Sequence, residues 1–354
     1  MRYYRIEIAN LFEMEIGDEK EKDRQIQIGR KPITVFSSHL DNRQMNTGAL
    51  NIVMNLSMCY YHQSQLGTSF VQIQGIPLQT LMQANDLRGK YIRIWGGMTK
   101  GYIVENDNYG ILLEGIICGP YGNWVGTNQT ISFFIGPTKL VIDPDIVFSW
   151  KRGQSLRDAI RATLKNTFPH EKIEIDISQD FQCLLDQGGV YNNLQEFSTA
   201  LSNFCKSNSK SKPINIYEAG GTLYATDNQF GRKIRLKPYE LVGQPTWSDN
   251  NDITVTLLMR ADISLNDIIN FPDDVSYYGI IHPIDNATDL LFNRGKNSSQ
   301  KNSVIFHGDF LVTSLQHVGN YKSPSSNEWI TILTVSAMDN AMVKTPAPKI
   351  NGLS

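Results

Sequence analysis

The chain has 354 residues, long enough for two or three domains that each bury a core of their own. Hydrophobic residues make up 41% and charged residues 19% of it, a balance that excludes both a disordered chain and a strongly charged one. The net charge of -2, without clusters of Lys and Arg among aromatic residues, argues against nucleic-acid specificity.

The N-terminus and the cysteines bear on where the protein is found. Residues 1–10, MRYYRIEIAN, alternate as a strand does and lack the apolar core of a signal peptide. No run approaches the ~18 apolar residues that a membrane helix needs. The cysteines are widely spaced and form no C-x-x-C pair, which favours buried free thiols: Cys59, Cys118, Cys183 and Cys205. We therefore expect no membrane segment and a reducing compartment, the cytoplasm in which the chain is made.

Residues 1–140 read almost entirely as β-structure and are taken as a first β-barrel domain. The clearest strand runs from Ala49 to Met58, where every second residue is apolar and expected to be buried: Leu50, Ile52, Met54, Leu56 and Met58. One short helix is predicted in PLQTLMQANDL, residues 77–87, before the strand GKYIRIW of residues 89–95.

Residues 141–212 read as a small α/β domain. A helix is predicted from Ser155 to Phe168, with Ser155 as its N-cap and Asp158 three residues on. One face of this helix is apolar and expected to be buried: Leu156, Ile160, Leu164 and Phe168. The expected role of this helix is to stabilise the fold.

A second amphipathic helix is predicted to begin near Asn193, with Glu196 as its capping partner. Before it lies the strand-like KIEIDIS of residues 172–178, and after it the polar loop of residues 206–212. Residues 213–227 then form a hairpin about two glycines. This hairpin either finishes the middle domain or begins the last one.

Residues 213–354 are taken as a second β-barrel domain. A strand after a polar turn at residues 248–252 alternates, with one apolar side: Ile253, Val255, Leu257 and Met259. A turn at Asn266 and Asp267 precedes another short apolar strand. The segments 309–319 and 329–337 form a hairpin that completes the barrel, and a polar loop interrupts the domain near residues 293–303. The predicted fold class is thus α+β, mainly β, with an α/β domain between two barrels.

Side chains with catalytic or metal-binding potential form no recognised constellation. The histidines are scattered without zinc-binding spacing and are expected in the surface or core: His39, His62, His170, His282, His307 and His317. The paired acids and acid-amide runs are better explained as turns than as a hydrolase pair or calcium loop: Asp143 with Asp145, Asp273 with Asp274, residues 249–252, and residues 107–108. We assign no catalytic, cofactor-binding or metal-ligating residue, and no enzyme activity.

Three stretches, in order, resemble baseplate hub proteins of contractile-tailed bacteriophages. The run YIRIWGGMTKGYIVENDNYGILLEGII, residues 91–117, is similar to part of the first barrel of these hubs. Residues 150–178 and 188–201 are similar to the α/β domain that joins the two barrels. Looser likeness comes from ITVTLLMR, DFLVTSLQHVGNY and EWITILTV, residues 253–260, 309–321 and 328–335, which resemble the closing strands of a second tube-like barrel.

This resemblance implies a structural protein of the tail baseplate, assembled in the host cytoplasm and carried in the virion. It would form a homotrimeric ring whose two barrels per chain imitate the sixfold tail tube, with the threefold central spike beneath. Its implied partners are the tail tube protein, the spike protein and the tape-measure protein.

Two other functions stay open at this point. A tail-associated peptidoglycan hydrolase would need an acidic or zinc constellation in a cleft. A carbohydrate-binding tail module would need Trp95 and Trp124 to be exposed together, whereas the five tryptophans spread over all three domains favour packing roles.

Overall fold

The computed structural model of the protein describes residues 1–16, 23–28, 32–40, 44–63, 69–101, 104, 106–136, 145–169, 171–178, 181–207, 213–219, 222–227, 231–247, 252–271 and 308–338. Within these residues the protein is mainly β, with a 13-stranded sheet and three smaller sheets. No helix in these ranges is long and apolar enough to cross a membrane. The polar loop predicted near residues 293–303 lies outside the described residues.

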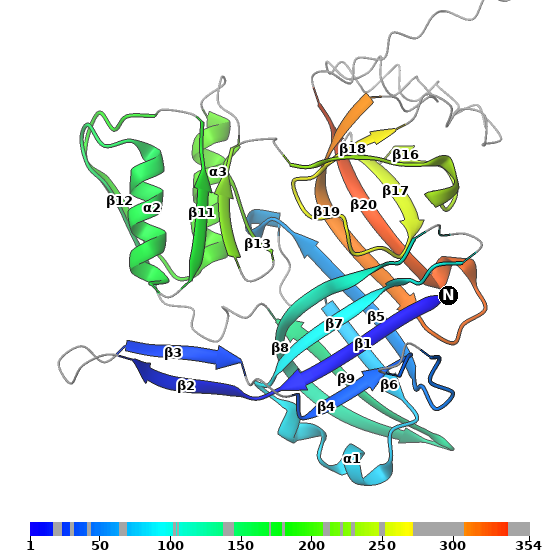
Figure 1. Cartoon of the computed structure of the whole chain (residues 1–354). Coiled ribbons are helices and arrows are strands. Elements are labelled where there is room, and N and C mark those ends of the chain that lie inside the picture. Colours follow the sequence, from blue (N-terminus) through cyan, green and yellow to red (C-terminus); the bar gives the residue numbers. More distant parts are fainter. Residues whose placement is uncertain are drawn as a thin grey trace, which may run out of the picture.

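Seven strands of the large sheet come from the first β domain, confirming its β-rich character (Figure 1). They are β1 (Arg2–Ala9), β4 (Thr34–Ser37), β5 (Asn51–Cys59), β6 (Ser69–Gln74), β7 (Tyr91–Met98), β8 (Asn108–Val125) and β9 (Asn128–Gly136). The short helix predicted after β6 is α1 (Leu78–Met82). Strands β2 (Leu11–Ile16) and β3 (Asp23–Ile28) pair with each other and extend away from the large sheet in Figure 1.

The first β domain curls around its own core. Ile6 of β1, Ile52 of β5 and Ile94 of β7 are fully buried in one apolar cluster, although β5 and β1 are distant in the strand order. Alternation places these side chains on one face of the sheet. The sheet curves toward that face, so side chains from distant strands come into contact. The burial predicted for β5 is confirmed at Ile52, Met54 and Leu56, whereas Leu50 and Met58 are partly buried.

The second β domain supplies the other six strands. They are β15 (Lys233–Arg235), β16 (Thr246–Trp247), β17 (Asp252–Leu258), β18 (Ile268–Phe271), β19 (Gly308–Asn320) and β20 (Trp329–Ala337). The predicted hairpin of the last two segments is confirmed by antiparallel pairing of β19 with β20. The apolar side predicted for β17 is fully buried: Ile253, Val255, Leu257 and the following Met259.

The expectation of two β-barrel domains is not confirmed in the described residues, where no closed barrel is found. The strand order is β16-β17-β20-β19-β5-β6-β9-β8-β7-β1-β4, an open sheet in which β15 and β18 extend from β19. The physical reason is that β5 pairs with β19 of the other domain. The edge of β5 that would close the first domain therefore pairs with β19 and joins the two domains.

The middle domain has two helices and two small sheets. Its elements are β10 (Ile146–Trp150), α2 (Leu156–Thr167), β11 (Lys172–Asp176), β12 (Gln187–Tyr191), α3 (Leu194–Ser207), β13 (Asn215–Ala219) and β14 (Thr222–Thr226). Strand β10 pairs with β12, and β11, β14 and β13 form the second sheet. The sequence did not decide whether the hairpin of residues 213–227 belongs to the middle or the last domain. In the structure this hairpin, β13–β14, pairs with β11 of the middle domain.

Both helix starts in the middle domain follow from their capping residues. The Ser155 hydroxyl accepts a hydrogen bond from Asp158 N, as predicted, and the buried face of α2 is Leu156, Ile160 and Leu164. At α3, Asn193 Oδ1 accepts from Glu196 N at 2.8 Å, while Glu196 Oε2 accepts from Asn192 N at 3.0 Å. The reciprocal bonds satisfy backbone donors that the first helical turn leaves free.

Truncation of Ile160 tests the assignment of α2 as a core helix. Ile160 is fully buried in the core of the middle domain, so Ile160→Ala is expected to lower the free energy of unfolding by about 2–5 kcal/mol. Lys165→Ala, at an exposed position of the same helix, is the control and should leave stability nearly unchanged. Urea unfolding monitored by circular dichroism measures both; equal midpoints for the two variants would contradict the assignment.

Candidate functional site

The candidate site is the junction where the two β domains become one sheet. The second half of β19 pairs antiparallel with β5, from Ser314 opposite Cys59 to Asn320 opposite Val53. The first half of β19 pairs with β18 along the same edge. A single long strand thus belongs to both domains and fixes their relative orientation (Figure 1).

Side chains of the second domain complete the core of the first. Met259 and Trp329 are buried in the first domain's apolar cluster, and Trp329 Nε1 donates to Gly97 O at 2.9 Å. Glycine is required at Gly97 because its φ is +140° and a Cβ there would collide with the backbone of Asn108. At Gly96 a Cβ would collide with Leu112 and lie 3.2 Å from the Met259 sulfur. The glycine pair in β7 therefore makes room for the partner domain.

A third glycine allows the same close approach from the other side. A Cβ on Gly319 of β19 would lie 2.7 Å from Met54 Cε and 2.9 Å from Trp329 Cζ3. These distances are shorter than real Cβ contacts, so a larger residue would force the indole or Met54 to move. The close packing of the junction depends on this position.

Arg2 fastens the connection between β19 and β20 to the N-terminal strand. Its Nη1 donates to the carbonyls of Asn320 at 2.8 Å and Tyr321 at 3.2 Å, and its Nη2 donates to Ser325 O at 2.7 Å. The guanidinium also lies over the Trp329 ring, 5.8 Å from its centroid. One planar cation thus satisfies several carbonyls of a turn that covers the buried indole.

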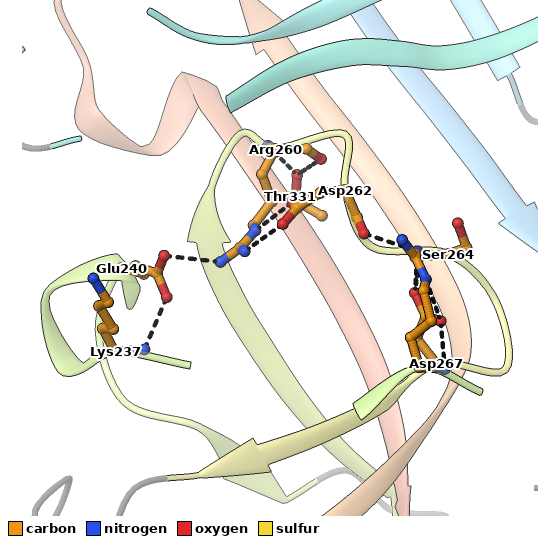
Figure 2. Close-up of polar contacts among 8 residues, drawn as sticks. Lys237, Glu240, Arg260, Asp262, Ser264, Asp267 and Thr331 are labelled. Atoms are coloured by element: carbon orange, nitrogen blue, oxygen red, sulfur yellow. Dashed lines mark hydrogen bonds and ion pairs between the residues drawn. The ribbon is translucent and has the colours of Figure 1, made fainter. Parts of the chain in front are cut away.

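A buried arginine organises the rim of the second domain (Figure 2). The Arg260 side chain is only 8% exposed, and its Nε and Nη2 each donate to a different carboxylate oxygen of Asp262 at 2.7 Å. Its Nη1 lies 3.2 Å from Glu240 Oε1, within ion-pair distance but outside hydrogen-bond geometry. Burial alone would raise the pKa of Asp262, but Arg260 outweighs burial and holds that pKa below its usual value.

A second arginine, Arg232, fixes the neighbouring turn, of which Ser264 and Asp267 are labelled in Figure 2. Asp267 accepts hydrogen bonds from Ser264 N and Arg232 Nη2, both at 2.8 Å. Asn266 has a φ of 69°, a left-handed conformation that asparagine tolerates better than most residues. The turn predicted at Asn266 and Asp267 is confirmed.

His317 lies in the same network, on the buried side of β19. Its Nδ1 lies 2.9 Å from Thr331 Oγ1, and that hydroxyl also accepts a hydrogen bond from Arg260 N at 3.1 Å. Complete burial lowers the pKa of His317 to about 3. The imidazole is therefore neutral in the folded protein, which confirms a core role for this histidine.

The other predicted candidates are not brought together at the junction. His39 and His62 are partly exposed, whereas His170, His282 and His307 lie outside the described residues, as do Asp143, residues 249–251, Asp273 and Asp274. Asp107 accepts a hydrogen bond from Lys100 N at 2.8 Å, consistent with a turn. Over the described ranges, no group of three or more His, Cys, Asp or Glu side chains could hold a metal ion.

The burial of Arg260 was not predicted from the sequence. Alternation places Arg260 on the polar side of β17, opposite Met259, yet the residue follows the end of the strand and its side chain turns inward. The signal that could have found it is Asp262, two residues on, which supplies the carboxylate that a buried guanidinium requires. Asp262, Glu240 and Asp267 are all held by Arg260 or Arg232. The arrangement is therefore suited to holding the turns of the second β domain rigid.

Comparisons with known proteins give a likeness of fold only. No protein-family model matches the chain, and no curated protein matches it. The Escherichia coli c3393 protein, a component of the type VI secretion system described as similar to the T4 bacteriophage tail proteins gp27 and gp5, aligns at 10% identity. The alignment covers 84% of this chain and 76% of that one, with a TM-score of 0.45.

Two proteins described as tail proteins align over most of their length. A tail protein from Neisseria meningitidis MC58 has 8% identity, covers 96% of this chain and 98% of its own, and has a TM-score of 0.47. A 43 kDa tail protein of prophage MuSo2 from Shewanella oneidensis has 8% identity, coverages of 81% and 98%, and a TM-score of 0.45. At these values the likeness assigns neither a family nor an activity, and the function proposed below rests on the junction.

Proposed function

We propose that this protein is a structural hub of a bacteriophage tail baseplate, a homotrimeric ring that adapts a sixfold tail tube to a threefold central spike. The observation that carries the proposal is the β5–β19 pairing, which joins two β domains of one chain into a single unit. Three such units contain six β domains around a threefold axis. A ring of this kind presents a sixfold arrangement to the tube and a threefold one to the spike.

Rigidity of the junction supports this role. An adaptor holds two symmetries in register only if its two β domains cannot turn against each other. Continuous strand pairing, the indole of Trp329 in the first domain's core and the Arg2 contacts all oppose such a rotation. A flexible two-domain binding protein would instead have a small polar interface between its domains.

The surface of the sheet at the junction suits a channel lining or a hydrated interface. The five neighbouring strands β20, β19, β5, β6 and β9 contain one charged residue, Asp309 at the start of β19. Amide side chains link strands on this surface: Gln316 Nε2 donates to Asn55 Oδ1 at 2.7 Å, and Asn51 Nδ2 to Gln74 Oε1 at 3.0 Å. Such a surface offers hydrogen bonds without charge, so it neither holds nor repels a charged chain that passes it.

The oligomeric state tests the proposal. Native mass spectrometry of the purified protein, alone and with the tail tube and spike proteins of the same tail, should give the mass of three copies. A mass of one copy under all of these conditions would contradict it. The tape-measure protein is a further proposed partner, to be added in the same series.

The carbohydrate-binding alternative loses its expected platform. Trp95 of β7 lies opposite Ile111, while Trp124 lies near the far end of β8. The two positions are separated along β8 by roughly 40 Å, at about 3.3 Å per residue. The Trp95 ring is moreover covered by the Arg93 guanidinium, 5.4 Å from its centroid. These tryptophans do not form one sugar-binding surface.

We also propose that the protein has no peptidoglycan hydrolase activity. Of the acids at the junction, Asp262 and Asp267 hydrogen-bond arginines and Glu240 lies at ion-pair distance from Arg260, so each is engaged in a contact within the protein. Purified cell wall incubated with the protein should release no soluble fragments, with a lysozyme reaction run beside it. Release of fragments that disappears on a single Asp or Glu substitution would overturn the proposal.

A further inference from the structure

Large apolar side chains are most exposed on two parts of the molecule. Among the described residues, the six that are at least 65% exposed all fall in these two parts. The first, called here the aliphatic surface, consists of Val147, Leu184, Leu185 and Val190 of the middle domain. The second, called here the hairpin tip, consists of Met82, Tyr121, Trp124 and Val125 of the first β domain.

The two valines of the aliphatic surface lie on the open face of a two-stranded sheet, and its two leucines precede the second strand. Val147 of β10 and Val190 of β12 lie directly opposite each other, each about two-thirds exposed. The alternate residues of β10, Ile146, Phe148 and Trp150, are packed in the core of the middle domain. Alternation predicts polar residues on a face that meets only water, so an exposed valine pair, preceded along the chain by the exposed Leu184 and Leu185, indicates a buried state in an assembly.

The hairpin tip is built to hold apolar side chains at the end of a projection. Gly126 adopts a φ of 61° in the turn between β8 and β9, and Trp124 Nε1 donates to Gly126 O at 2.8 Å, which fixes the indole. Leu81 of α1 packs on Gly122 of β8, where a Cβ would lie 2.6 Å from Leu81 Cδ1, and this contact brings Met82 to the tip. An ordered aromatic residue with few rotamers to lose is typical of an interface anchor.

The occupant of the aliphatic surface is inferred from the match between these two surfaces. They lie at opposite ends of the molecule in Figure 1, so they cannot meet within one chain. Residues 115–138 and residues 146–150 contain no charged residue, and the one charged residue of 184–190, Asp186, accepts a hydrogen bond from Arg152 N at 2.7 Å, so the contact would be largely uncharged. Eight side chains of this size, about half to four-fifths exposed, would bury on the order of 1,000 Å², the area at which specific protein interfaces begin.

We propose that the hairpin tip of one copy docks on the aliphatic surface of the next copy. This inference rests on the proposed ring, and it names the surfaces through which neighbouring copies meet. The two surfaces differ, so the contact is head-to-tail, and a head-to-tail contact closes into a ring when its rotation is a whole fraction of a turn.

Single charges placed on either surface test the contact. Val190→Asp and Val125→Lys each put a charge into the apolar interface and should convert the three-copy species into monomers that still melt cooperatively, because both positions are exposed and outside the core. Tyr239→Asp is the matched control, at an exposed ring away from both surfaces, and should leave the three-copy species intact. Native mass spectrometry and thermal melting are measured for each variant.

A chain that carries both substitutions adds a readout that misfolding cannot imitate. In a head-to-tail ring every contact of the Val125→Lys, Val190→Asp variant places a lysine near an aspartate, so the double variant should recover the three-copy species in low salt and lose it in high salt. A wild-type trimer that survives both single substitutions would overturn the inference and leave the ring standing. A wild-type protein that is monomeric with its partners present would overturn both.

Discussion

Trp329→Ala is expected to lower the free energy of unfolding by about 3–5 kcal/mol, the range for removal of a large buried side chain. The indole fills the space between Gly319, Met54 and the Arg2 guanidinium, and its N–H satisfies a buried carbonyl of the other domain. Truncation therefore leaves a cavity and also an unpaired acceptor at Gly97. Urea unfolding of both proteins measures the difference.

Trp329→Phe separates the two contributions. Phenylalanine keeps most of the ring volume but cannot donate to Gly97 O, so its cost should be near that of one buried hydrogen bond, about 1–3 kcal/mol. If the alanine variant unfolds at the wild-type urea concentration, the indole does not support the junction and the rigid-unit argument fails. A two-step transition in the alanine variant alone would show that the two β domains have become independent.

Acid is expected to destabilise the protein through His317. The pKa of this buried histidine is lowered to about 3 from an ordinary value of 6.5, so the unfolded chain takes up a proton that the folded protein refuses. Above pH 6.5 the imidazole is neutral in both states and does not lower the stability of the folded protein. The free energy of unfolding then falls as pH falls from 6.5 toward 3. The slope is about 1.4 kcal/mol per pH unit, the free energy equivalent of one pKa unit.

The control for this prediction is His317→Gln. Glutamine can still hydrogen-bond Thr331 but does not titrate, so the variant should lose most of the slope between pH 6.5 and 4.5. A smaller slope remains in both proteins because partial burial also lowers the pKa of His39. Asp262, whose pKa is held below its usual value, also stabilises the folded protein, and this contribution is lost only below about pH 4. Equal slopes for the two proteins over the upper range would show that His317 is not the titrating group.

Local patterns predicted most of the secondary structure because their causes are local. The start of α2 follows from Ser155 and Asp158, and the buried side of β17 follows from strict alternation. Each depends on residues within a few positions of one another.

The pairing that joins the domains could not be predicted in the same way. Gln316 and Asn55, which meet across the junction, are 261 residues apart, and no periodicity within either strand specifies its neighbour. Two curled sheets with unpaired edges are compatible with closed barrels or with one joined sheet, and only the packing of Trp329 and Met259 distinguishes them. The glycines at positions 96, 97 and 319 carry this information, but their role is visible only once the approaching side chains are known.

Electron microscopy of the assembled tail tests the proposed trimeric hub. We expect a ring of three copies around an open channel between tube and spike, in which each copy contributes two β domains of similar fold that superpose after rotation about the ring axis. A density with one copy per tail, or with two β domains that do not superpose, would contradict it.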